Sequence, residues 1–135
     1  MPIIPWDKSF ETGVPLLDET RKRFLLKANL FCLKCKIYCA PLECEEGLSS
    51  LETLLLSYFS KEEALQKESE YPYFHHHQAT HDHLRARMRE IGFLLRSNAF
   101  SESSLQEFYH FLSDVFCEHL RFDDIKFAKY LQENQ

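Results

Sequence analysis

Apolar residues recur every three or four positions along most of the chain, which is the period of helices that each bury one face. Three such stretches run from Leu16 to about Tyr38, from about Ser49 to about Glu70, and from about Phe74 to Arg96. A fourth follows Ser101, a residue type that caps helices, and continues to Leu120. A last apolar set up to Leu131 extends this fourth helix or forms a short tail helix.

Helix-breaking residues set the expected limits of these helices. Pro41 is expected to end the first helix, and the second is expected to start at Ser49 and Ser50, after Gly47. Pro72 disfavours helical geometry in the residue before it and should separate the second helix from the third. The connections between the predicted helices are therefore short.

The segment from Met1 to Pro15 is expected to form an extended N-terminal arm. It carries three prolines, Pro2, Pro5 and Pro15, together with Gly13, and these residues disfavour a helix. Trp6 and Phe10 are the large apolar residues of this segment and are expected to hold the arm against the helices.

The composition fits one all-α domain that covers residues 1–135. Only 3 Gly and 5 Pro are present, too few for the frequent turns of an all-β domain. Hydrophobic residues make up 44% of the chain and 12 of them are Phe, which is enough to fill a core between helices. Four helices with short connections predict an antiparallel up-down-up-down four-helix bundle.

Charge and cysteine content narrow the expected partners and compartment. The net charge of −5 and the pI near 5.8 argue against nucleic acid as a partner, because phosphate binding needs clustered Lys and Arg. No apolar run approaches the length of about 20 residues that spans a bilayer, so no membrane association is expected. Four of the five cysteines lie between Cys32 and Cys44, which favours reduced thiols in a cytoplasm.

Two histidines of the third predicted helix have the spacing of a chelating pair. His77 and His81 lie four residues apart, so both imidazoles share one helix face, and this face also carries apolar residues. The alternative is one buried histidine with ordinary hydrogen bonds beside one solvated histidine. The apolar surroundings favour metal ligands, because two buried imidazoles without a metal would be short of partners. His75, His76 and His83 fall on the outward side.

Carboxylates on two other helices are candidates for the same site. Glu62 lies on the inward face of the second helix, one turn after Tyr58, where an unpaired carboxylate would be costly. Its neighbour Glu63 is interpreted as a surface residue. On the fourth helix His119 faces inward, and Asp123 and Asp124 both follow it. Five residues of α-helix turn through about 500°, so spacing alone prefers Asp123 without excluding Asp124.

The clustered thiols offer a second candidate site. Cys32, Cys35 and Cys39 recur at helical steps and Cys44 follows shortly, so a four-thiolate zinc or iron–sulfur site is conceivable. A continuous helix would spread these thiols over two turns, and small buried side chains are the commoner use of Cys. We therefore expect these cysteines to bind no metal of their own.

Short motifs spread along nearly the whole chain occur in a characteristic order. They are Ile4-Pro5-Trp6-Asp7, Gly13-Val14-Pro15, Leu17-Asp18-Glu19, the run from Tyr58 to Glu63, Tyr71-Pro72 followed by His77 and His81, and the run from His119 to Asp124. In this order they resemble the motifs of bacterial hemerythrins, a family of four-helix bundles.

The resemblance implies a set of metal ligands. In the family two irons are bridged by one Glu and one Asp, and one iron takes three His while the other takes two. Carried over to this chain, the three-histidine iron would have His77, His81 and His119. The bridging carboxylates would be Glu62 and Asp124, so the resemblance prefers Asp124 over Asp123.

Two positions depart from the family pattern, and both concern the second iron. The histidines expected in the first and second helices are replaced by Arg21 and Tyr58. We hypothesise that the Arg21 guanidinium occupies the space of the second metal and pairs with Glu62 and Asp124. The alternative is that Arg21 reaches solvent at the end of the bundle. Tyr58 is expected to donate a hydrogen bond to a carboxylate or, alternatively, to bind iron as a phenolate.

The leading functional expectation is a hemerythrin-like, non-enzymatic protein without catalytic residues, whose site is reduced to one metal. It would bind or sense iron or a small diatomic ligand such as dioxygen. Iron is favoured by the resemblance, although the ligand set also suits zinc or manganese. Three alternatives stay open: a two-iron dioxygen binder with Tyr58 as substitute ligand, a mononuclear non-haem metal enzyme, and a metal-free bundle for protein contacts.

Overall fold

The computed structural model describes residues 4–37 and 40–134, and every regular element within these ranges is helical. The elements in chain order are the 3₁₀ turn η1 (Lys8–Phe10), the α-helices α1 (Pro15–Ile37), α2 (Pro41–Glu68), α3 (Phe74–Ser97) and α4 (Glu102–Asp114), the π-helix η2 (Val115–Asp124) and α5 (Ile125–Glu133). None of the described helices is long and apolar enough to cross a membrane.

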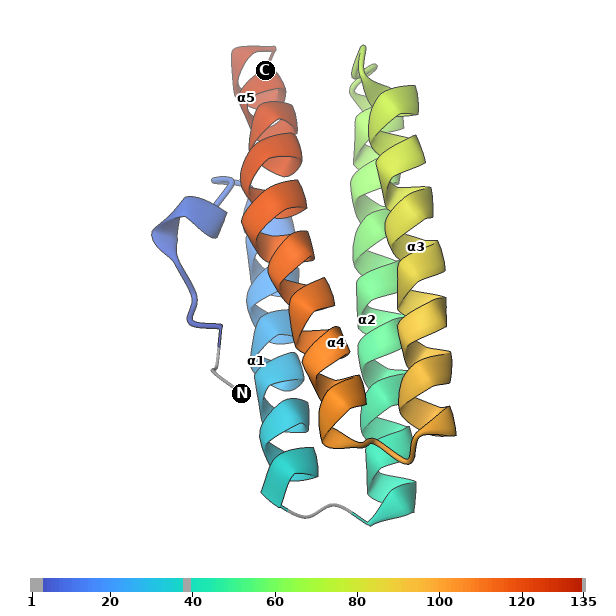
Figure 1. The fold of residues 1–135 in the computed structure, drawn as a ribbon. Coiled ribbons are helices and arrows are strands. Elements are labelled where there is room, and N and C mark those ends of the chain that lie inside the picture. Colours follow the sequence, from blue (N-terminus) through green and yellow to red (C-terminus); the bar gives the residue numbers. More distant parts are fainter. Residues whose placement is uncertain (1–3, 38–39, 135) are drawn as a thin grey trace.

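The helices pack side by side as a bundle, which confirms the predicted all-α class (Figure 1). Each of α1, α2 and α3 contacts the helix that follows it, and α4 returns to contact α1. In Figure 1 the chain runs down α1, up α2 and down α3, and α4, η2 and α5 continue upward as one rod. The last apolar set of the sequence thus extends the fourth helix.

Phenylalanine fills much of the space between the helices. Phe59, Phe108, Phe111, Phe116 and Phe127 are fully buried and come from α2, α4, η2 and α5. Burying a side chain of this size contributes roughly 1.5–3 kcal/mol. These rings therefore help to hold α2 and the rod of α4, η2 and α5 around the polar groups described below.

The start of α2 differs from the sequence prediction, which placed it at Ser49 and Ser50. The helix begins at Pro41 itself, with Ala40 as an extended residue before it. Proline is well tolerated at the first helical position, where its missing N–H would have no partner anyway. Gly47 lies inside the helix, where a Cβ would come within 3.0 Å of the Phe31 ring. It thus permits close approach of α1 and α2.

The limits of the other helices follow the sequence more closely. α1 ends at Ile37, and the expected last residue Tyr38 lies outside the described residues. The predicted cap of the fourth helix is confirmed, because the Ser101 side chain accepts a hydrogen bond from the backbone N–H of Ser104.

The segment before α1 lies along the bundle from residue 4 onward, and its first three residues are outside the described part. Ile4 and the side chain of Asn29 exchange two hydrogen bonds, with distances of 3.2 and 2.8 Å. Phe10 is buried, and its backbone carbonyl accepts a hydrogen bond from Nη1 of Arg21. This carbonyl links the N-terminal segment to the polar centre of the bundle.

Candidate metal centre

Five side chains from α2, α3 and η2 converge in the interior of the bundle. Glu62 comes from α2, His77 and His81 come from α3, and His119 and Asp124 come from η2. All five are buried, and one potential ligand atom from each lies within 4.8 Å of every other. The structure thus brings together the five residues expected as metal ligands. Within the described ranges, no other group of three or more His, Cys, Asp or Glu is as close.

The distances between the donor atoms match those expected around a single ion. The Nε2 atom of His77 lies 3.0 Å from Oε1 of Glu62 and 2.9 Å from Oδ1 of Asp124. The Nε2 atom of His81 lies 3.0 Å from Glu62 Oε1 and also 3.0 Å from Nε2 of His119. Donors bound at right angles to one ion at about 2.1 Å are separated by about 3 Å.

Three of these donor atoms have no hydrogen bond of acceptable geometry although they are fully buried. They are Oε1 of Glu62, Nε2 of His77 and Oδ1 of Asp124. Buried polar atoms in native proteins nearly always have a partner, and an ion is one explanation for those that do not. The unpartnered atoms coincide with the proposed donors, so the residues present fit a metal ion.

The π-helix explains how both His119 and Asp124 reach the centre. These residues are five positions apart, and the i→i+5 hydrogen bonds of a π-helix bring such residues close to the same face. In an α-helix the spacing favours Asp123. In the structure Asp123 is instead 40% exposed, and its Oδ2 lies 3.1 Å from Nδ1 of His119. Asp124 is fully buried, with Oδ1 3.2 Å from Nε2 of the same histidine.

Two carboxylates outside the centre orient its histidines. The Nδ1 atom of His81 lies 2.7 Å from Oε2 of Glu63, which also accepts a hydrogen bond of 2.5 Å from Arg85. Asp123 makes the corresponding contact with His119. A carboxylate at Nδ1 fixes the proton there and leaves Nε2 as a metal donor. The expectation that Glu63 is a surface residue is therefore wrong, since its side chain is only 13% exposed.

Arg21 and Tyr58 lie on the opposite side of the two central carboxylates. Nη2 of Arg21 lies 2.6 Å from Oδ2 of Asp124, and Nε donates to the Tyr58 hydroxyl at 2.8 Å. That hydroxyl donates in turn to Asp124 Oδ2 at 2.5 Å and lies 3.4 Å from Oε2 of Glu62. Arg21 is 1% exposed, so the alternative in which it reaches solvent is wrong. Its connection to Glu62 passes through Tyr58.

In each of the two central carboxylates, one oxygen atom lies near the imidazoles and the other near the Tyr58 hydroxyl. Oδ1 of Asp124 and Oε1 of Glu62 face the three imidazoles. Oδ2 of Asp124 and Oε2 of Glu62 face the phenol, and the former also faces the guanidinium. The two carboxylates therefore lie between a set of imidazole donors and a fixed organic cation.

The charges of the metal-free centre shift several pKa values. Burial alone would raise the pKa of Asp124, but His119, His77 and Arg21 hold it well below its usual range. Burial alone would lower the pKa of His77, yet contacts with Asp124 and Glu62 raise it to about 9. His119 behaves in the same way, and its pKa rises to about 10. Without a metal, protonated imidazoles therefore supply the missing positive charge.

Burial is also the main reason that the pKa of Tyr58 lies well above its usual range, and the charges of Asp124 and Glu62 add to the effect. The side chain is therefore a neutral phenol in this environment, able to donate its proton to a carboxylate.

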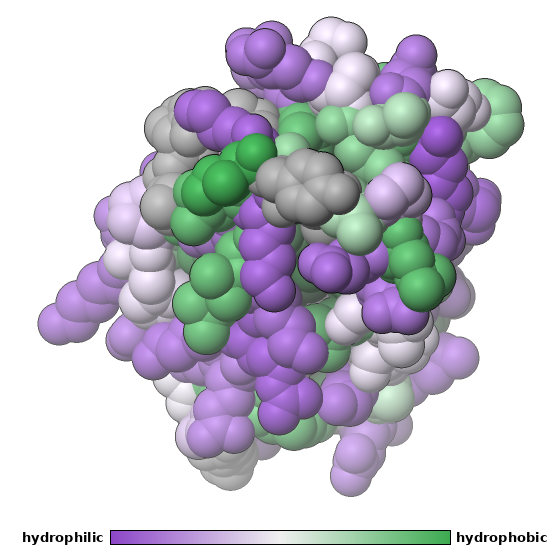
Figure 2. Space-filling model, turned by 90° about the horizontal axis from the view of Figure 1, so that it is seen from below, coloured by the Kyte–Doolittle hydropathy of each residue, from purple (hydrophilic) through white to green (hydrophobic). Residues whose placement is uncertain are grey.

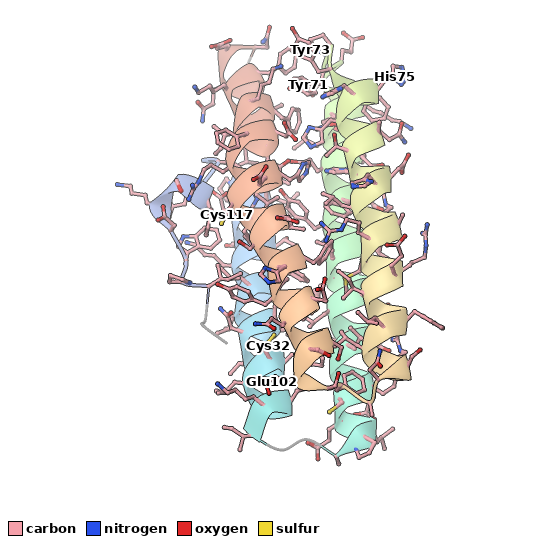
Figure 3. All side chains as sticks on the ribbon, in the orientation of Figure 1. Cys32, Tyr71, Tyr73, His75, Glu102 and Cys117 are labelled. Carbon is pink, nitrogen blue, oxygen red and sulfur yellow. The ribbon has the colours of Figure 1, made fainter. Side chains whose placement is uncertain are left out.

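The other described histidines and cysteines are not part of this group of donors. His75, His76 and His83 are exposed, as expected, and Figure 3 shows His75 at the upper end of α3. Cys32 lies toward the other end of the bundle (Figure 3), and burial raises the pKa of its thiol to about 11. The Sγ atoms of Cys35 and Cys44 lie 3.6 Å apart, whereas Cys39 lies outside the described residues. The prediction that these cysteines bind no metal stays a prediction.

Comparison with known proteins supports the family suggested by the motifs. No family model matches the chain. Two proteins named bacteriohemerythrin, from Campylobacter jejuni subsp. jejuni serotypes O:6 and O:2, are each 26% identical to it over 127 residues. The match covers 94% of this chain and 94% of each relative. These relatives, together with the helical bundle, support a hemerythrin-like family for this chain.

Loss of either histidine of the pair is expected to abolish stoichiometric metal binding. His77→Ala and His81→Ala each remove one of only three imidazoles that face the centre. His75→Ala and His76→Ala are the controls, because both remove exposed imidazoles on the same helix. Metal analysis of untagged protein measures the effect, and equal loss in all four variants would show a loose histidine-rich tract instead of a defined site.

The orienting carboxylate Glu63 is expected to influence metal affinity without binding the metal. Glu63→Gln should weaken binding by about 10- to 100-fold, as is usual for the hydrogen-bond partner of a ligating histidine. Competition with a chelator of known affinity measures this. Glu68→Gln, an exposed change on the same helix, is the matched control. Equal affinities in the two variants would contradict an orienting role.

The metal-free protein is expected to lose stability as the pH rises above neutrality. The pKa values of His77 and His119 are raised from 6.5 to about 9 and about 10. Their stabilisation is thus complete below pH 6.5 and is lost as the pH rises through these values. Urea unfolding of chelator-treated protein measures the slope. The control variant His75→Gln should show the same loss of stability with rising pH as the parent. A free energy of unfolding that stays constant up to pH 9 would contradict this prediction.

Proposed function

We propose that this protein is a hemerythrin-like metal-binding protein whose centre holds one metal ion between His77, His81, His119, Glu62 and Asp124. Support comes from the converging donors, their unpartnered buried atoms and the bacteriohemerythrin relatives. The name of these relatives favours iron, although three imidazoles with two carboxylates also suit zinc or manganese. Bound iron would supply a redox-active Lewis acid in a buried site.

The position of Arg21 and Tyr58 is the observation that favours one ion over two. Two carboxylates in an apolar bundle need about two positive centres nearby, one on each side, since burying them unpaired would cost several kcal/mol each. A metal among the imidazoles supplies one positive centre. The Arg21 guanidinium, 2.6 Å from Asp124, supplies the other from the side where a second bridged ion would bind.

The Tyr58 phenol strengthens this proposal. In the metal-free centre, burial raises the pKa of Tyr58 well above its usual range, so the phenol keeps a proton that it can donate to a carboxylate. Its hydroxyl also accepts a hydrogen bond from Arg21 and donates one to Asp124, so it acts as a bridge between cation and carboxylate. We therefore propose that Arg21 and Tyr58 together replace the second metal.

The role that we propose for the centre is binding or sensing of iron or of a small diatomic ligand, without catalysis. The chain's own residues would hold the ion, keep the imidazoles in the right tautomer and exclude bulk water. Tyr71 contributes to this exclusion, because its buried ring lies 6.5 Å from that of His77 near the upper end of the bundle (Figure 3).

Restoring both missing histidines is expected to create a second metal site. Arg21→His with Tyr58→His removes the organic cation and supplies two imidazoles, so iron content should rise from near one to near two per chain. Elemental analysis of iron-loaded untagged protein measures this. A parent protein that already holds two irons per chain would support the alternative of a two-iron centre with Tyr58 as ligand.

Removal of Arg21 alone is expected to destabilise the protein strongly. Arg21→Ala leaves Asp124 with one positive partner fewer in a buried site, which typically costs about 3–5 kcal/mol. Lys22→Ala, an exposed change at the next position, should alter the free energy of unfolding by no more than about 0.5 kcal/mol. Urea unfolding compares the two, and equal stabilities would show that Arg21 does not balance the carboxylates.

A further inference from the structure

The outer face of α1 carries a row of exposed apolar residues. The row consists of Leu26, Leu30, Leu33 and Ile37, whose side chains are 62%, 46%, 44% and 76% exposed. Their spacing of four, three and four residues aligns them on one side of the helix, opposite the buried side that holds Ala28 and Phe31. Figure 2 views the end of the bundle where α1 leads to α2 and shows apolar residues among polar ones there.

A helix that packs in a bundle through one face normally presents polar residues on the other. The row on α1 has instead the alternating three- and four-residue spacing by which helices form a seam with a second helix. Contiguous apolar residues on a protein surface mark an interaction site or a liability for aggregation. The row therefore suggests a partner that covers α1.

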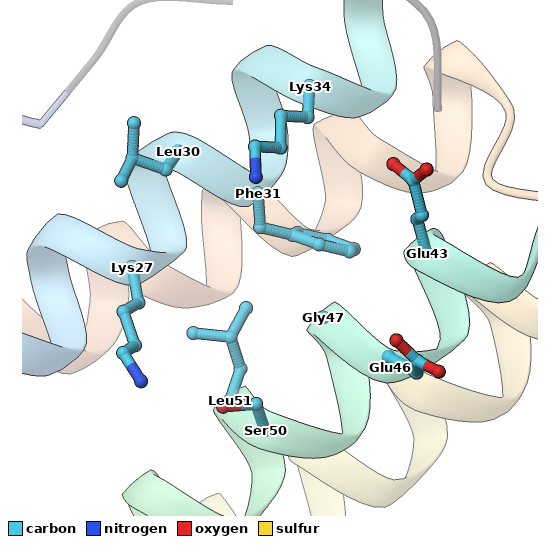
Figure 4. Close-up of a pocket in the computed structure, with 9 residues that line it drawn as sticks. All are labelled: Lys27, Leu30, Phe31, Lys34, Glu43, Glu46, Gly47, Ser50 and Leu51. Atoms are coloured by element: carbon cyan, nitrogen blue, oxygen red, sulfur yellow. The ribbon is translucent and has the colours of Figure 1, made fainter. Parts of the chain in front are cut away.

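A groove between α1 and α2 lies beside this row and has walls of opposite charge (Figure 4). It has a volume of about 540 Å³. Lys27 and Lys34 line it from α1, whereas Glu43 and Glu46 line it from α2. Phe31 and Leu51 supply apolar surface between the two walls, and the Phe31 ring lies directly against Gly47.

The charges on the two helices are unequally distributed. Every charged residue of α1 after Glu19 is basic, and the first turns of α2 carry Glu43 and Glu46 among other acids. Within the described part of the chain, Lys27, Lys34, Glu43 and Glu46 take part in no salt bridge. These four charges remain available to a partner that carries the opposite arrangement.

We propose that this face is the interface of a symmetric dimer of the chain, in which α1 of each copy lies over α2 of the other. A two-fold axis parallel to the bundle produces this arrangement. It places the lysine wall of one groove against the glutamate wall of the other. The apolar row of each copy then packs on the apolar residues of the partner's groove and is removed from solvent.

Two other arrangements fit the charges less well. If α1 lay against α1 of the second copy, the lysines beside the two apolar rows would face one another. If the face lay on an anionic membrane, the lysines would be favourable, but Glu43 and Glu46 would face negative headgroups. The paired walls of opposite sign therefore select the second copy as the occupant.

Light scattering coupled to size-exclusion chromatography tests the dimer with the full chain. The expected mass is twice the chain mass of 16.1 kDa, with dissociation on dilution. Leu30→Asp with Leu33→Asp should raise the dissociation constant by about 30-fold or more, because each lies at the centre of the row. Phe93→Asp, an equally accessible apolar position on α3 with 73% exposure, is the control that should leave the mass unchanged.

Charge reversal tests the pairing of α1 with α2. Lys27→Glu with Lys34→Glu, and separately Glu43→Lys with Glu46→Lys, should each give monomers, and mixing the two variants should restore a dimer. A parent chain that stays monomeric at its highest soluble concentration overturns the proposal, as does a mixture that stays monomeric. A monomer that sediments with phosphatidylserine vesicles, and fails to do so after the lysine reversal, would assign the face to a membrane.

Discussion

Glu62 and Asp124 place two carboxylates in the interior of an apolar bundle, and their charge has to be compensated there. Both are fully buried, and neither can stay ionised in an apolar bundle without positive charge beside it. Three imidazoles stand on one side of the pair and a guanidinium on the other. An ion among the imidazoles and the fixed cation of Arg21 would place a positive centre on each side of the carboxylates without a second ion.

Several features of the fold follow from the need to hold these groups in place. The change from α- to π-helix at η2 brings His119 and Asp124 to one face. Glu63 and Asp123 hold the outer nitrogens of His81 and His119, so that the inner nitrogens converge. Arg21 is held by Tyr58 and by the backbone carbonyl of Phe10, which ties the N-terminal segment to the centre. The site is therefore supported by every rod of the bundle.

The sequence predicts the helical class well and the site in part. Helical period identifies the α3 pair, and Glu62 stands out because a carboxylate among apolar residues needs a partner. The period of an ideal α-helix favours Asp123 and misses the π-helix, so only the family resemblance points to Asp124. The contact of Glu63 with His81 joins two helices and has no signal in local spacing. Pro41 marks a helix start as readily as an end, which explains the error at α2.

X-ray absorption at the iron edge of iron-loaded, untagged protein reports the neighbours of the metal itself and therefore distinguishes one ion in the centre from two. We expect scattering from imidazole and carboxylate ligands and no iron–iron shell, since Arg21 and Tyr58 lie on the far side of the carboxylates. An iron–iron shell at the short distance of a carboxylate-bridged pair would contradict it.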